Sequence, residues 1–280
     1  MNVADFYIDD ATVPDGCSTG LIPRDYEAFP VGCYASAVPM QAVANMPLIP
    51  QSEWSDRIRE QETNKTRLSD IRNRGMNGSP IPSLDQNGNG YQDGMAKWGY
   101  CWTHSSTHAV MLCRAVANSP YVPLSAFAVA ATIKNGRNQG GWGAQSLDFI
   151  GDRGVPSQQF WPQKDVNLRN GTAECWDNAK LHRMTEGWID LDAAQYDRNL
   201  TFAQVATCLL SGIPVVGDFN WWGHSVCLMD LVETSPGRFG VRIWNSWADS
   251  WGENGTGILS GSKAIPDGAV APRVVTPSIV

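Results

Sequence analysis

The apolar residues of this chain change their spacing near residue 212. Before that point they recur at helical intervals, and helices are predicted over 53–73, 101–117, 124–134, 143–154 and 202–212. After it the apolar runs are shorter and separated by turn residues, which predicts strands over 214–220, 224–233, 239–247 and 255–261. A chain that is mainly helical first and mainly β last is expected to fold as an α+β protein.

Composition narrows the class of protein further. The 280 residues are 42% hydrophobic and 18% charged, which predicts a globular chain with one large domain or two lobes. A net charge of −7 without any basic cluster argues against nucleic acid as a partner. No segment approaches the roughly 20 apolar residues of a membrane span, so no membrane association is expected.

The first residues and the cysteines indicate the compartment in which the protein is expected. The start of the chain, MNVADFYIDDATV, lacks the basic residues and apolar run of a signal peptide. Seven cysteines are scattered without a CxxC pair, which favours free thiols in a reducing compartment. We therefore expect a cytoplasmic protein or, if it belongs to a virus particle, a virion-associated one.

Three residues have the chemistry of a thiol-based active site. A nucleophilic cysteine needs a base, and the base needs a group that orients it. Cys101, His224 and Asn245 occur in that order. Cys101 lies at the start of a predicted helix, where the positive end of the helix dipole favours a thiolate. With the thiol on a helical lobe and the imidazole on a β lobe, we expect a cleft between the two.

Four motifs resemble those of papain-like cysteine peptidases, over about residues 80–262. They are the nucleophile segment GYCWTHSS, the Gly-Gly segment NQGGWGAQSLDFIGDRGVPSQQFWP, the His segment GHSVCLMDLV and the Asn segment IWNSWADSWGENGTGIL. The resemblance implies a two-lobed fold, with Cys101 on a helical left lobe and His224 and Asn245 on an antiparallel, β-barrel-like right lobe. It also implies hydrolysis of peptide bonds through a thioester acyl-enzyme, with Cys101 as nucleophile, His224 as general base and acid, and Asn245 as orienter.

The same resemblance implies how substrate binds. The backbones of Gly140 and Gly141 would pair with an extended peptide, and Trp102 and Trp247 would support the site as aromatic walls. The substrate is expected to be a peptide or protein, and no cofactor is required.

One position departs from the family pattern. The family carries a glutamine six residues before the nucleophile, which donates to the oxyanion, but this chain has Met95 there. Gln86 and Gln92 lie further upstream, and the sequence between them and Cys101 is interpreted as an insertion. Gln86 is the first choice for the oxyanion donor and Gln92 the second. The loss of such a donor would lower the rate by about 10²–10³.

The insertion itself has the spacing of a calcium loop. Asp85, Asn87, Asn89 and Asp93 occupy positions 1, 3, 5 and 9, and Gly90 occupies position 6, where a tight turn is needed. Position 12 is an alanine rather than the usual bidentate glutamate. A structural calcium ion is therefore one hypothesis, and an Asn/Gly-rich turn without an ion is the other.

The chain is predicted to have three parts. Residues 1–79 form an N-terminal extension, residues 80–262 a papain-like catalytic domain, and residues 263–280 a C-terminal tail. The extension is interpreted as an inhibitory propeptide, as a permanent arm or as a cap over the cleft. The apolar tail is either disordered or adds an extended strand to another subunit, so protein assembly through extension and tail is a further possibility.

Two functions from different classes follow. The first is a papain-like cysteine-type endopeptidase. The second is a papain-fold structural component of a larger assembly, such as a virus particle, whose triad has weak or no proteolytic activity. The complete Cys101–His224–Asn245 set favours the first function, whereas the displaced glutamine, the uncleaved extension and the apolar tail favour the second.

The other histidines are expected to be structural. His104 and His108 are four residues apart, which predicts helix-face or core packing rather than a zinc site. His182 lies in a polar stretch and is expected to be exposed.

Overall fold

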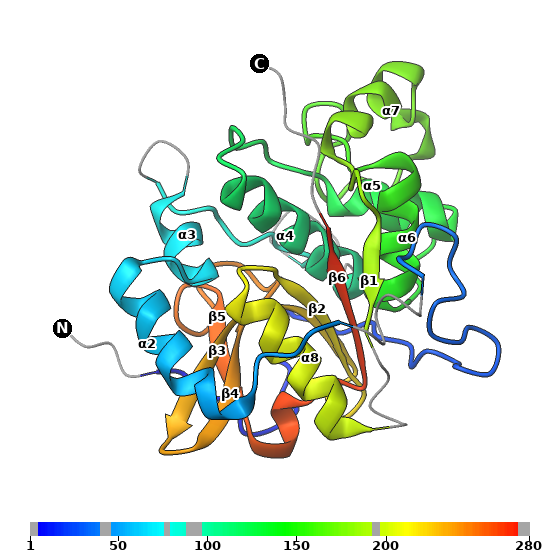
Figure 1. The fold of residues 1–280 in the computed structure, drawn as a ribbon. Helices are drawn as coiled ribbons and strands as arrows, with labels where there is room; N and C mark the ends of the chain where they lie inside the picture. Colours follow the sequence, from blue (N-terminus) through cyan, green and yellow to red (C-terminus); the bar gives the residue numbers. More distant parts are fainter. Residues whose placement is uncertain (1–4, 40–45, 76–78, 88–96, 192–196, 274–280) are drawn as a thin grey trace.

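The structure is a computed structural model that describes residues 5–39, 46–75, 79–87, 97–191 and 197–273 (Figure 1). Its α-helices are α2 (Trp54–Asn64), α3 (Leu68–Arg74), α4 (Cys101–Val116), α5 (Ala126–Lys134), α6 (Gly143–Arg153), α7 (Ala173–Ala179) and α8 (Arg198–Leu210). Short 3-10 helices are η1 (Gln51–Glu53), η2 (Leu168–Asn170), η3 (Lys180–His182) and η4 (Gly261–Ala264). The strands are β1 (Trp188–Asp190), β2 (Val215–Phe219), β3 (His224–Ser235), β4 (Arg238–Trp244), β5 (Thr256–Ser260) and β6 (Gly268–Pro272).

The six strands form one antiparallel sheet in the order β1-β6-β2-β3-β4-β5. The mixed helix and sheet architecture confirms the α+β prediction, but the sheet is open and does not close into a barrel. Closure would require β1 to pair with β5, and each of these strands instead lies at an edge. The β-barrel-like description of the right lobe is corrected accordingly.

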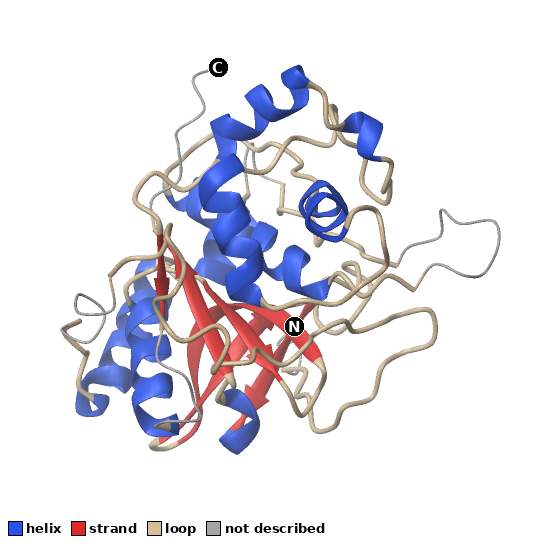
Figure 2. Cartoon of the chain, turned by 90° about the vertical axis from the view of Figure 1, so that its right-hand side faces the viewer, coloured by secondary structure: helices blue, strands red, loops and turns tan. Residues whose placement is uncertain are grey.

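Helices cover both faces of the sheet (Figure 2). Helix α4 packs against β2, β3 and β6, and α6 packs beside it against β1, β2 and β6. On the other face, α8 packs against β2, β3 and β6, and α2 contacts both α8 and β3. Because both faces are covered, every residue of β2 and β6 is buried, and so are the first eight of β3. In the described part of the chain, no helix is long and apolar enough to cross a membrane.

The N-terminal extension covers both edges of this sheet. Tyr7 forms a parallel bridge with Ile258 on the edge strand β5, and Ala37 forms one with Trp188 on the edge strand β1. Unpaired edge strands expose backbone donors and acceptors that invite pairing with other chains. The extension supplies part of that pairing from within the same molecule.

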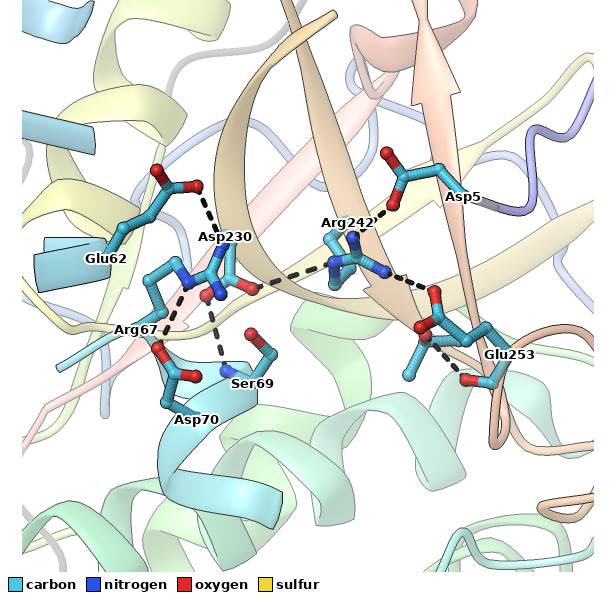
Figure 3. A network of polar contacts seen from close by, with 9 residues as sticks. Asp5, Glu62, Arg67, Ser69, Asp70, Asp230, Arg242 and Glu253 are labelled. Atoms are coloured by element: carbon cyan, nitrogen blue, oxygen red, sulfur yellow. Dashed lines mark hydrogen bonds and ion pairs between the residues drawn. The ribbon is translucent and has the colours of Figure 1, made fainter. Parts of the chain in front are cut away.

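A polar network attaches the helical part of the extension to the same sheet (Figure 3). The buried Asp230 carboxylate on β3 accepts a hydrogen bond of 3.3 Å from the N–H of Ser69 in the first turn of α3. Arg242 on β4 pairs with Asp5 at 2.8 Å and with Glu253 at 3.1 Å, and its Nε lies 4.0 Å from Asp230. The extension is thus tied to β3 and β4 at two separated points.

Some element boundaries differ from the predicted ones, because the residues that set them were not recognised in the sequence. The helix expected over 53–73 is two helices, because Lys65 adopts a left-handed conformation that ends α2 before α3 begins. The helix expected over 202–212 begins at Arg198 and is capped by Asp197, whose carboxylate accepts hydrogen bonds from two backbone N–H groups of the first turn. Within the segment expected to be a C-terminal tail, the structure places the inner strand β6.

Candidate active site

Cys101 is the first residue of α4, as the sequence predicted. Its side chain is fully buried, and its thiol lies beside backbone groups of Ser225, Gly20 and Trp102. Burial raises the pKa of the thiol to about 12, and the hydrogen bonds from these backbone groups act in the opposite direction. The site therefore holds a neutral thiol as long as it is closed to water.

His224 and Asn245 come together from β3 and the end of β4. The imidazole Nε2 and the Asn245 Oδ1 are 2.8 Å apart. The same oxygen accepts a hydrogen bond of 2.8 Å from the N–H of Ser246, which identifies it as the acceptor atom of the amide. The hydrogen on His224 consequently sits on Nε2, and the Nδ1 lone pair is available.

The remaining surroundings of His224 bury its ring and keep it neutral. Nδ1 is buried and has no hydrogen-bond partner among the described residues. Ser225 follows His224 directly, and its backbone lies beside the Cys101 thiol, so the imidazole and the thiol come from adjoining parts of the site. The Trp247 ring stacks on the imidazole at 4.6 Å, and Trp222 meets it edge-on at 4.8 Å. Burial lowers the pKa of His224 to about 4, so the resting ring is neutral.

Gln86, the first choice for the oxyanion donor, lies in this site. Its Oε1 accepts a hydrogen bond of 2.7 Å from the Ser246 hydroxyl, which leaves the amide NH2 group to donate. That group donates to the carbonyl of Ser18 at 2.8 Å and to the carbonyl of Trp98 at 3.0 Å. Gln92, the second choice, lies outside the described residues.

Residues 18–22 of the extension pass through the site. The N–H of Gly141 donates to the carbonyl of Gly20 at 3.1 Å, and the N–H of Ile22 donates back to the carbonyl of Gly141 at 2.9 Å. The N–H of Leu21 donates to the carbonyl of Gly223, beside His224, at 3.1 Å. The backbone positions expected to bind an extended substrate are therefore bonded to the chain's own N-terminal part.

The glycines in this contact are needed for close approach. A Cβ on Gly20 would lie 2.1 Å from the carbonyl oxygen of Gly99, and a Cβ on Gly141 would lie 2.7 Å from the Trp102 ring. Gly140 faces the same segment, since its Cβ would meet the carbonyl oxygen of Gly20 at 2.4 Å. No side chain larger than hydrogen fits at any of these positions without a backbone shift.

The two predicted aromatic residues lie at the site in different ways. Trp102 is fully buried in α4 and donates to the carbonyl of Gly99 at 3.2 Å. Trp247 covers His224 and donates to the carbonyl of Ser18 at 2.9 Å. The Trp247 ring contacts residues 18–22, and the Trp102 ring contacts their partner Gly141. Both rings therefore line the region where the extension lies.

Only part of the predicted calcium loop can be placed. Asp85 Oδ2 pairs with Lys164 at 3.1 Å, and Asp85 Oδ1 accepts from the N–H of Asn87 at 2.9 Å. Asn87 Oδ1 in turn accepts from the Ser18 hydroxyl and from the N–H of Trp98. Asn89 and Asp93 lie outside the described residues. The two described side chains match an Asx-turn, and the calcium ion stays a prediction.

The other histidines are structural, but one was placed wrongly from the sequence. His108 stacks on Trp244 at 3.9 Å and its Nε2 accepts from the N–H of Leu84, and His104 Nδ1 bonds the Tyr100 carbonyl, in line with core packing. His182, expected to be exposed, is only 2% exposed. Its Nδ1 lies 2.9 Å from the carbonyl of Val155, a partner that is remote in sequence and left no local signal.

Sequence reasoning missed three contributors to the site. Ser246 positions both Asn245 and Gln86, and its place next to Asn245 was the available signal. Residues 18–22 gave no periodic signal, because their partners are backbone groups far along the chain. Asp218 lies in an apolar run on β2, where a buried charged residue could have drawn attention.

Comparison with known proteins was made at the levels of sequence and structure. No family model and no curated protein matches the sequence. Among solved structures, the chain is similar to xylellain, a cysteine protease from Xylella fastidiosa, with a TM-score of 0.57 and 15% identity over 94% of this chain and 100% of that one. It is also similar to the Amb a 11 cysteine protease of ragweed pollen in its proform, with a TM-score of 0.56 and 12% identity over 89% and 73% of the two chains. Bromelain from Ananas comosus matches with a TM-score of 0.51 and 18% identity, over 69% and 94%.

These likenesses define the fold class. The chain has the fold of the papain-like cysteine proteases. The likeness to xylellain covers 94% of this chain, which is a larger part than residues 80–262 make up. The likeness therefore extends beyond the predicted catalytic domain.

Proposed function

We propose that this protein is a papain-like cysteine endopeptidase that hydrolyses peptide bonds through a thioester on Cys101. One observation carries the proposal: Nε2 of His224 lies 2.8 Å from Asn245 Oδ1, and Nδ1 of the same ring has no hydrogen-bond partner among the described residues. The backbone of Ser225, the residue after His224, lies beside the Cys101 thiol. A thiol, a base with an available lone pair and an orienting amide are the three parts of nucleophilic catalysis by cysteine.

The reaction follows from these positions. His224 Nδ1 takes the thiol proton, and the Cys101 sulfur attacks the substrate carbonyl carbon. The oxyanion accepts hydrogen bonds from the N–H of Cys101, which has no intrahelical acceptor in the first turn of α4, and from the amide of Gln86. The imidazolium then gives its proton to the departing amine as the C–N bond breaks. Water, deprotonated by the same imidazole, hydrolyses the thioester and restores the thiol.

The closed cleft supports a latent resting state. The Ser18 carbonyl occupies the Gln86 amide, and Gly20 and Leu21 occupy the backbone partners Gly141 and Gly223. Burial raises the pKa of Cys101 and lowers that of His224, so both resting groups are neutral. Displacement of residues 18–22 by substrate would free the Gln86 N–H that now bonds the Ser18 carbonyl, and it would admit the polar environment in which the ion pair forms.

Gly20→Ala is the variant that tests this proposal. The added methyl would lie 2.1 Å from the Gly99 carbonyl oxygen, so the backbone around Gly20 must shift, while residues 80–262 remain unchanged in sequence. The measurement is intact mass after treatment of the full chain with a peptidyl epoxide. We expect one adduct that forms at least about tenfold faster in Gly20→Ala than in wild type and is absent in Gly20→Ala/Cys101→Ala.

Controls separate the possible outcomes. Asp15→Ala, at an exposed position of the same extension, should label at the wild-type rate. If Gly20→Ala gives no epoxide adduct although iodoacetamide modifies Cys101, the site is not competent and a structural role in an assembly is the better description. A parallel series with EGTA tests the proposed structural calcium ion at Asp85–Asp93, whose removal should slow labelling.

A further inference from the structure

Asp218 is a buried carboxylate that the proposed mechanism does not use. It lies on β2 and is 8% exposed. Its Oδ2 accepts a hydrogen bond of 2.9 Å from the N–H of Gly143 at the start of α6. Its Oδ1 has no hydrogen-bond partner in the part of the chain that the structure describes. A buried carboxylate oxygen without a partner is costly, so its presence calls for a ligand.

This carboxylate lies beside both the nucleophile and the peptide-binding backbone. In the sheet, Asp218 pairs with Ser225, the residue after His224, and its negative charge raises the pKa of the Cys101 thiol. The N–H group that donates to Asp218 belongs to Gly143. This residue lies two positions after Gly141, the glycine that bonds the extension. A side chain projecting from a peptide bonded to Gly141 therefore has Asp218 within its reach.

The positive charge near Asp218 comes from the extension, but it is engaged elsewhere. Arg24 acts on Asp218 through space, while its guanidinium forms two hydrogen bonds, of 2.8 and 2.9 Å, with Asp190. Tyr26 lies near the carboxylate, because a Cβ placed on Gly268 would be 2.9 Å from the Tyr26 hydroxyl and 3.5 Å from Asp218 Oδ2. Both Arg24 and Tyr26 continue the segment that fills the cleft.

The ionisation of Asp218 is set by all the groups that face it. Burial raises its pKa to about 6, whereas the Ser225 hydroxyl, the Gly143 N–H and the Arg24 charge lower it and Asp267 raises it. At neutral pH the carboxylate is therefore ionised. An ionised carboxylate at this depth is stabilised most by a cation that bonds it directly.

We propose that Asp218 is the specificity-determining residue for a lysine or arginine side chain of the substrate peptide that pairs with Gly141. The substrate cation bonds the free Oδ1 after residues 18–26 have moved away. This inference rests on the proposed peptidase function and names the substrate class of that same site.

The test uses full-length Gly20→Ala protein and fluorogenic peptides varied at each residue before the scissile bond. At one position, arginine or lysine should be preferred over citrulline and leucine by about ten- to hundredfold in kcat/KM, the range expected for a hydrogen bond to a charged group. Asp218→Asn keeps an acceptor for the Gly143 N–H and should abolish that preference, so that arginine and citrulline peptides are cleaved at equal rates by this variant. Asp267→Asn, which removes a neighbouring charge, should keep the preference.

A second measurement keeps this inference separate from the peptidase proposal. Binding of the same peptides, with citrulline and arginine compared, is measured by fluorescence anisotropy on Gly20→Ala/Cys101→Ala, with and without Asp218→Asn. Binding that favours arginine through Asp218, without any hydrolysis by the Cys101 form, would retain the inference and overturn the peptidase. Hydrolysis with equal rates for arginine and citrulline would overturn the inference and retain the peptidase, and neither hydrolysis nor binding would overturn both.

Discussion

Burial sets the charge state of all four histidines in this chain. His104, His108, His182 and His224 are each no more than 2% exposed. Burial lowers the pKa of His104, His182 and His224 to about 4, and that of His108 well below its usual value. At position 224 a neutral imidazole is the form that the proposed mechanism requires, whereas at the other three positions it is the consequence of core packing.

The stability of the protein should consequently fall as the pH falls from 6.5 to about 4. In this window the unfolded histidines bind protons that the folded ones exclude, so each contributes up to about 1.4 kcal/mol per pH unit. Asp218 has the opposite sign, because its raised pKa makes the folded state bind the extra proton between pH 3.8 and about 6. Burial also raises the pKa of Asp230, which therefore has the same sign as Asp218. Four histidines outweigh these two carboxyls. We expect His182→Gln to flatten the pH dependence of the unfolding free energy, as measured by urea denaturation at pH 4.5, 5.5 and 6.5.

His182 is the right position for this test because it lies outside the candidate site and bonds a backbone carbonyl that an amide can also reach. If the His182→Gln variant kept the wild-type slope, the buried imidazole would not control acid stability.

At the scale of elements, one buried ion pair fixes the extension to the edge strand β1. Arg24 and Asp190 are 2.8 Å apart with side chains 5% and 1% exposed, and the N–H of Gly32 donates to the same carboxylate. Arg24 also donates to the carbonyls of Phe29 and Pro30. The loop of residues 24–32 is thus closed on itself and bonded to β1 through the same two side chains.

Arg24→Met should destabilise the protein by about 3–5 kcal/mol, because it leaves the Asp190 carboxylate buried without its partner. The measurement is chemical denaturation of the full chain. The matched control is Arg57→Met, which breaks an exposed pair with Glu53 on the surface of α2 and should change stability by less than about 0.5 kcal/mol. Equal effects of the two substitutions would contradict the role given to this pair.

The elements themselves were predictable where their signal is local. Helix α4 and strands β2, β3, β4 and β5 lie where their periodicity placed them. Strands β1 and β6 were missed, because a three-residue strand and the run GAVAP have too little alternation to register. Their strand state depends on pairing with each other and with β2, and such pairing is a tertiary contact.

At the scale of the whole molecule, the predicted N-terminal extension and the predicted catalytic domain form one packed structure. Residues 5–39 bridge β5, cross the cleft and bridge β1, while α2 and α3 pack against α8, α4 and β3. The core cluster includes Ile8, Trp54 and Leu68 from the extension together with residues of the sheet. This continuity argues for cooperative unfolding rather than for a separately folded prosegment.

Hydrogen exchange should report that cooperativity. The amides of Ile8, Leu21 and Ile22 donate to carbonyls of β5 and of the cleft, and we expect protection within about tenfold of the slowest β3 amides. The measurement is native-state exchange with peptide-level mass spectrometry. Rapid exchange of peptides covering residues 5–39, with β3 still protected, would indicate an extension that opens by itself.

The candidate site was predictable from chemistry, but its occupied state was not. Cys101, His224, Asn245 and Gln86 were named because each residue type has a role that motif order reveals. The segment 18–22 reaches the same site through backbone groups only, and a backbone bond carries no side-chain signature in the sequence. Asp218 was passed over for a related reason, since its partner Gly143 contributes an N–H that any residue would have.

The β-bridges of Tyr7 and Ala37 connect the proposed latency of the active site with the protection of the sheet edges against aggregation. The stretch of chain that blocks the cleft also shields the two open margins of the sheet, on either side of the blocked centre. Removal of residues 5–39 would uncover the Cys101 thiol and would also leave the edge strands β1 and β5 free to pair with strands of other chains. We therefore expect activation to require only that residues 18–22 move, while the contacts of Tyr7 and Ala37 with the sheet edges are kept and the extension remains part of the protein.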